Sequence, residues 1–122
     1  MVIQSANGQL FTCKSCNKIH FEFLSVAIDF VDIKALSEFN EYLNGIDFDK
    51  YEQQNRDNQY RRKVVIPFPN AGIKMMLTSG EGKELVSLVN SFRFNYLVKK
   101  KKQRASTRIL TVSMNLPTIN PN

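Results

Sequence analysis

The spacing of apolar residues in this 122-residue chain changes from strand-like to helix-like twice. Apolar side chains alternate over residues 19–30 and are then spaced three or four apart over residues 33–43. The same order returns as alternation over 64–77 and helical spacing over 85–96. Neither strand–strand–helix unit could bury its apolar face alone. We therefore predict an α+β domain, in which both units build one antiparallel sheet and both helices cover one face.

The two units also correspond position by position, with an offset of 47 residues in the strands and 49 in the helices. An internal duplication and the shared demands of burial explain this match equally well, and both interpretations stay open. In either case the sequence predicts one core, made of Phe21, Ile28, Phe30, Leu36, Phe39, Ile66, Phe68, Met75, Leu77, Leu85 and Leu88.

Shorter signals mark the ends of the expected elements. Residues 9–12 read as another strand, which makes a three-stranded meander at the N-terminus. Asp32 is expected to cap the first helix, and Gly45 to end it in a left-handed conformation. Residues 47–61 are polar and predict an exposed connection with one helical turn near Tyr51. Residues 78–81 predict the start of the second helix.

Both cysteines and the single histidine lie within eight residues, 13–20. The spacing of Cys13 and Cys16 is typical of a zinc knuckle, and Asn17 tolerates the left-handed backbone expected after the second cysteine. His20 and Glu22 would share one face of the following strand. We predict zinc bound by Cys13, Cys16 and His20, with Glu22, water or a second subunit as fourth ligand. A knuckle turn without metal is the alternative.

The same cysteines indicate the compartment. Two cysteines separated by two residues close too short a loop to be a useful staple, so we expect reduced thiols in a cytoplasmic protein. The N-terminal residues lack the pattern of a signal peptide, and no apolar run approaches the roughly 20 residues that span a bilayer. A membrane partner is not expected.

The net charge of +6 is located at one end of the chain. Residues 93–122 hold seven of the 17 basic residues and no acid, which leaves residues 1–92 at −1. We therefore divide the chain into a domain at 1–98 and a basic extension at 99–122. Alternating apolar residues suggest a late strand within this extension: Leu110, Val112, Met114 and Leu116.

The basic extension offers a nucleic-acid interface. Its cations are Lys99, Lys100, Lys101, Lys102 and Arg104. A run of lysines is also typical of a solvated helix end, where it complements the helix dipole. No glycine-rich phosphate loop and no arrangement of a nucleophile with a base occurs in the sequence, so we expect no enzyme. An open zinc site is the remaining catalytic option.

The run Cys13-x-x-Cys16-Asn17-Lys18-x-His20, followed by two strand–strand–helix units, resembles a family of small uncharacterised bacterial proteins that open with C-x-x-C-G-K-x-H. The resemblance covers about residues 10 to 97, and the chain departs from it in having Asn17 for glycine and a lysine-rich extension. This family has no established activity. The function we expect is a metal-stabilised binding or adaptor module for a protein partner, with homodimerisation as an option; the alternative is a nucleic-acid-binding accessory protein.

Overall fold

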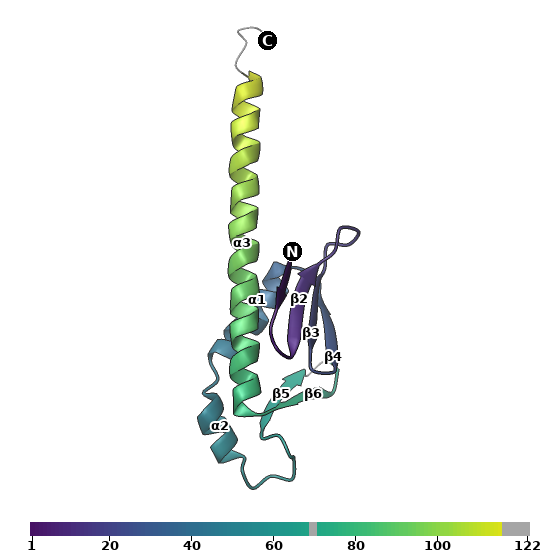
Figure 1. Cartoon of the computed structure of the whole chain (residues 1–122), viewed down its shortest axis with the longest axis vertical. Coiled ribbons are helices and arrows are strands. Elements are labelled where there is room, and N and C mark those ends of the chain that lie inside the picture. Colours follow the sequence, from purple (N-terminus) through teal and green to yellow (C-terminus); the bar gives the residue numbers. More distant parts are fainter. Residues whose placement is uncertain (69–70, 116–122) are drawn as a thin grey trace.

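The computed structural model describes residues 1–68 and 71–115, with side chains through residue 105. Figure 1 shows two small sheets beside one long helix. The elements follow in the order β1 (Val2–Gln4), β2 (Gly8–Thr12), β3 (Ile19–Phe23), β4 (Val26–Phe30), α1 (Ile33–Asn44), α2 (Phe48–Gln54), β5 (Val64–Phe68), β6 (Ile73–Leu77) and α3 (Ser79–Asn115). The predicted α+β class is confirmed.

Strands β1 to β4 form an antiparallel meander in chain order, one strand longer than predicted. One face of this sheet contributes to the core, and its centre is the most buried part: the alternating residues Ile19, Phe21 and Phe23 of β3 are all buried. Helix α3 packs on β1 and β2, and α1 packs on β4 and α3. Phe21 of β3 meets Phe39 of α1 with ring centroids 5.9 Å apart. The prediction that both helices cover one face is therefore confirmed.

Strands β5 and β6 form a separate two-stranded sheet instead of extending the first one. The second hairpin lies near the end of the four-stranded sheet (Figure 1), where Phe68 contacts Phe39 at a centroid distance of 5.8 Å. The two hairpins are also paired differently, since Phe21 faces Ile28 whereas the corresponding Phe68 faces Ile73. The four-residue loop between β5 and β6 shifts the register relative to the two-residue loop of the first hairpin.

The predicted core is confirmed, because all eleven of its residues belong to one apolar cluster. Seven are buried and four are partly buried against them. Further buried residues lie outside this list of eleven, most of them within the apolar patterns of the expected strands and helices: Leu10, Ile19, Phe23, Leu43, Phe48, Val64, Val89 and Phe92. Burial of this apolar surface is the main stabilising contribution to the fold.

The predicted helix starts are confirmed, and one helix end is not. Asp32 caps α1, because its Oδ1 accepts from the backbone N–H of Ala35 at 2.9 Å. Gly45 ends α1 at φ −83°, so the expected left-handed conformation is wrong. The turn before α3 is a reciprocal capping box: the Glu81 N–H donates to Thr78 Oγ1 at 3.1 Å, and the Thr78 N–H donates to Glu81 Oε1 at 2.9 Å.

Helix α3 runs without interruption from Ser79 to Asn115. Leu110, Val112 and Met114 belong to this helix, so the late strand is wrong over these positions; Leu116 lies outside the described residues. The Lys, Gln, Arg and Ala residues at 99–105 are strong helix formers and carry the helix across the expected boundary at residue 99. No helix among the described residues offers a stretch both long and apolar enough to traverse a bilayer.

Candidate metal centre

The cysteine turn, residues 13–18, connects two neighbouring strands of the larger sheet. Strands β2 and β3 pair from Gly8–Phe23 up to Thr12–Ile19, and the turn follows this last pair. Phe11 and His20 face each other in the next pair of this register, one pair further from the turn. Strand pairing therefore fixes the position of His20 relative to the turn that holds both cysteines.

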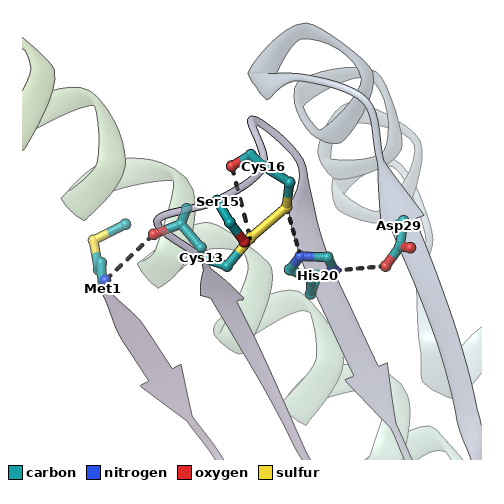
Figure 2. The surroundings of a disulfide bond; sticks show 7 residues. Met1, Cys13, Ser15, Cys16, His20 and Asp29 are labelled. Atoms are coloured by element: carbon teal, nitrogen blue, oxygen red, sulfur yellow. Dashed lines mark hydrogen bonds and ion pairs between the residues drawn. A yellow bond between two sulfur atoms is a disulfide. The ribbon is translucent and has the colours of Figure 1, made fainter.

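Figure 2 shows that the cysteine turn folds back over His20. The two sulfurs and a ring nitrogen of His20 all lie within 4.8 Å of one another. Cys16 Sγ is 3.2 Å from His20 Nε2. All three residues are partly buried, so they are shielded by the turn and still reachable from solvent. The structure thus brings together the three residues that the spacing singled out.

In this structure Cys13 and Cys16 are joined as a disulfide (Figure 2). The expectation of reduced thiols is therefore wrong for this state. The turn holds the two Cα atoms 5.8 Å apart, which is inside the range of disulfide geometry. The expected left-handed Asn17 is wrong too, because Leu24 is the only non-glycine residue with positive φ in the described chain.

Asp29 orients His20 from the neighbouring strand. The two residues face each other in the β3–β4 register, and His20 Nδ1 lies 2.7 Å from Asp29 Oδ1 (Figure 2). A carboxylate accepts a hydrogen bond at this nitrogen, so in the neutral ring Nδ1 carries the proton and the lone pair is on Nε2, which faces Cys16. On the other side the ring of Phe11 lies 5.0 Å from the imidazole, centroid to centroid. His20 is consequently held in the tautomer and orientation of a metal ligand.

Glu22 does not join the three ligands. It is exposed two positions further along β3, and its Oε1 accepts from Gln9 Nε2 at 2.9 Å across the β2–β3 ladder. The fourth ligand expected from Glu22 is therefore not part of the group that the structure gathers.

Two residues at this centre escaped the sequence analysis. Asp29 was not among the predicted site residues, and Phe11 was assigned only to the strand expected at residues 9–12. The signal for Asp29 was present: a two-residue turn at Leu24–Ser25 fixes a hairpin register in which Asp29 faces His20. The position of Phe11 beside His20 depends on the register between β2 and β3. The six-residue cysteine turn is compatible with more than one register, so the sequence does not predict this contact.

Once the disulfide is reduced, the ligand set is two thiolates and one imidazole. Sulfur and nitrogen donors of this kind suit zinc, which takes four ligands in tetrahedral sites. Three protein ligands fill three of these positions and leave one open. Both cysteines also line a cavity of about 410 Å³, which we call the lysine cavity because Lys18, Lys99 and Lys100 line it as well.

The basic residues 99–104 are exposed along α3. Lys99 and Lys100 line the lysine cavity beside the cysteine turn. Lys101 and Arg104 line a different depression on the helix, to which Lys100 also contributes. Part of the segment predicted as a separable extension, namely Lys99, Lys100 and Gln103, therefore lines a cavity together with residues of the folded body.

These observations define a small α+β protein with a cysteine–histidine cluster at a hairpin turn. The chain belongs to a family of unknown function, DUF6686, whose family model matches residues 1–115. The match begins before the expected residue 10 and includes most of the basic extension, which the resemblance had excluded. No curated protein and no solved structure matches the chain.

Proposed function

We propose that this protein is a zinc-stabilised binding module, in which Cys13, Cys16 and His20 hold the ion. The observation that carries the proposal is the convergence of these three ligand atoms within 4.8 Å, supported by the hydrogen bond between His20 and Asp29. Bound zinc would tie the cysteine turn to β3 and fix the end of the sheet, as structural zinc does in small domains.

A protein is the partner that we expect for this module. Phe94 and Leu97 lie three positions apart on α3, and their side chains are 68% and 41% exposed. Together with Val98 they border a depression of about 250 Å³ that also includes Arg93 and Lys101. An apolar anchor flanked by cations fits a protein surface with an apolar pocket and carboxylates at its rim.

Metal titration tests the zinc site directly. Purified protein, reduced with a phosphine so that both thiols are free, should bind one equivalent of Zn²⁺, measured by elemental analysis after desalting and by competition with a chromophoric chelator. Cys16→Ser should abolish tight binding, because two ligands do not hold zinc at this strength. Lys14→Gln, in the same turn but exposed and outside the ligand group, should keep the wild-type affinity. Reduced wild-type protein that stays free of zinc would contradict the proposal.

Nucleic acid is the second candidate partner, and one specific observation supports it. Lys99, Lys100, Lys101, Lys102 and Arg104 are all exposed on a helix that contains no acid after Glu84. Contacts with phosphates would make binding weaken steeply with salt, whereas an apolar protein interface would respond little. Binding to a labelled duplex at several salt concentrations, with Lys101→Gln/Lys102→Gln as the variant, separates the two candidates.

A further inference from the structure

We propose that the lysine cavity binds a small organic carboxylate, which completes the coordination of zinc at its open position. This inference rests on the proposed zinc site and names the class of ligand that reaches it. The cavity of about 410 Å³ falls in the range of small-molecule sites and includes Cys13 and Cys16 in its wall. An ion held by these sulfurs would therefore lie at the edge of the cavity.

The charge of the cavity favours an anion. A zinc ion with two thiolates and a neutral imidazole carries no net charge, so the charge of the cavity is set by the surrounding side chains. Lys18, Lys99 and Lys100 line the cavity, against Asp32 as its single acid. The Asp32 carboxylate is engaged in capping α1. None of the three lysines takes part in an ion pair between described residues, so their charges are available to a ligand.

Apolar side chains in the same wall point to an organic ligand in preference to a bare inorganic ion. Ile33 and Tyr96 are partly buried there, and Val31 at the rim is 65% exposed. Lys100 Nζ lies 5.6 Å from the centre of the Tyr96 ring, which holds this cation next to the apolar surface. A carboxylate oxygen is an accepted zinc ligand, and an attached hydrocarbon group would cover Val31 and Ile33.

Benzoate is a suitable probe, with benzyl alcohol as its uncharged analogue. The reduced protein is first loaded with Zn²⁺, and its metal content is measured before any probe is added. Benzoate binding is then followed by calorimetry, and in Co²⁺-loaded protein by the visible bands that report ligand exchange. We expect one benzoate per metal, a change in the cobalt bands, and no binding of benzyl alcohol.

Paired lysine variants locate the site. Lys99→Gln/Lys100→Gln should weaken benzoate binding by about tenfold, because two cations are removed from the wall, while metal content stays at one equivalent. Lys101→Gln/Lys102→Gln removes the same charge from the same helix, away from this cavity, and should change the benzoate affinity by less than about twofold.

Several results would overturn the inference. Zinc-loaded protein that ignores benzoate, equal losses in both double variants, or tighter binding of inorganic phosphate than of benzoate would each exclude a carboxylate at this place. A doubled mass on zinc loading, measured by light scattering and unaffected by benzoate, would show that a second subunit supplies the fourth ligand. Absence of zinc in the first measurement would overturn the proposed function, and this inference with it, before benzoate is tested.

Discussion

At the scale of single residues, His20 connects the two halves of the candidate metal centre. Its Nε2 faces Cys16 Sγ at 3.2 Å, and its Nδ1 faces Asp29 Oδ1 at 2.7 Å. In the proposed zinc site the carboxylate would act on the ion only through the ring: it would fix the tautomer, limit rotation and increase the basicity of the nitrogen that coordinates. Asp29 is therefore a positioning residue for His20.

Replacing Asp29 by Asn should lower zinc affinity about 10- to 100-fold, since the amide no longer holds the imidazole as a charged acceptor does. One equivalent of zinc should still bind at high concentration, because the three ligands remain. The measurement is a chelator competition on the reduced protein. Glu22→Gln is the matched control: it removes a carboxylate from the same sheet but outside the ligand group, so its affinity should equal that of the wild type.

Cys13, Cys16 and His20 could be found from the sequence because scarce residue types with ligand spacing are visible without a fold. Glu22 was included because strand alternation places it on the same face as His20. Alternation predicts which face of the strand a side chain is on, but not its distance from the cysteines. Asp29 and the lysines at 99 and 100 contribute through strand register and helix placement, and these depend on packing of distant segments. The candidate metal ligands can thus be predicted from the sequence. The residues that orient or surround them are much harder to predict.

At the scale of elements, the first turn of α3 is shaped by its contact with α2. Gly82 lies against the ring of Phe48, and a Cβ added at Gly82 would overlap with the ring atoms. Gly80, two positions earlier, has open space: the nearest atom to an added Cβ is Thr78 Oγ1 at 4.0 Å. Gly80 and Gly82 therefore have different roles, although both lie at the start of α3: only Gly82 is required by a close contact.

Gly82→Ala should destabilise the protein by about 1–3 kcal/mol, because displacing the Phe48 ring costs more than the gain in helix propensity. Gly80→Ala should leave the free energy of unfolding unchanged or raise it by up to about 1 kcal/mol. Urea denaturation followed by circular dichroism measures both. Equal effects of the two substitutions would show that Phe48 does not pack closely against Gly82.

The pH dependence of stability is set partly at the same turn. The hydrogen bonds from Arg62 lower the pKa of Glu81 below its usual value of 4.5, against the opposing effect of burial. A lowered pKa in the folded state means that the stabilisation is present above the unfolded pKa and is lost as pH falls through the folded pKa.

Glu81→Gln should therefore reduce the melting temperature at pH 7, and the difference from wild type should shrink as pH falls through the folded pKa of Glu81, below which Glu81 is neutral as well. Thermal melts over this pH range provide the measurement. Glu38→Gln on the exposed side of α1 serves as control and should show no such convergence. A gap between wild type and Glu81→Gln that is the same at every pH would argue against the ion pair with Arg62.

The strands and helix starts were predictable because alternation and capping residues are local signals. The length of α3 was not. The alternating run Leu110, Val112, Met114 has the period of a strand, because positions i and i+2 lie on opposite sides of a helix. The strong helix formers that precede it nevertheless favour continuation of the helix through these positions. The division into two sheets could not be predicted either, because the pairing of one hairpin with another does not change the alternation of apolar residues within their strands.

At the scale of the whole molecule, α3 joins all other layers. It packs against α1, α2, β1, β2 and β6. Glu84 of α3 accepts from Ser5 Oγ and the Asn7 N–H at 2.6 and 2.7 Å, so it attaches the turn between β1 and β2 to the helix. Buried Asn40 of α1 donates to Asn90 Oδ1 of α3 at 2.7 Å. The N-terminal half of α3 is consequently the scaffold of the fold.

Figure 1 shows that the C-terminal half of α3 extends past both sheets. Ending the chain after residue 105 should therefore change the melting temperature by less than about 2 °C, because the helix turns at 106–115 lie beyond both sheets. Ending it after residue 95 should lower the melting temperature clearly, since Tyr96 packs on Phe92 with centroids 5.9 Å apart. A large loss on removing residues 106–122 would indicate that this end has a packing partner, such as a second copy.

The continuity of α3 has a consequence for the dimensions of the molecule. At 1.5 Å per residue, a helix of 37 residues measures about 55 Å, whereas a compact domain of this size is only about 35 Å across. A partner bound to the far turns would be held at a set spacing from the cysteine turn, as at the end of a stiff rod. The protein should accordingly diffuse more slowly than a sphere of its mass and scatter X-rays as an elongated particle.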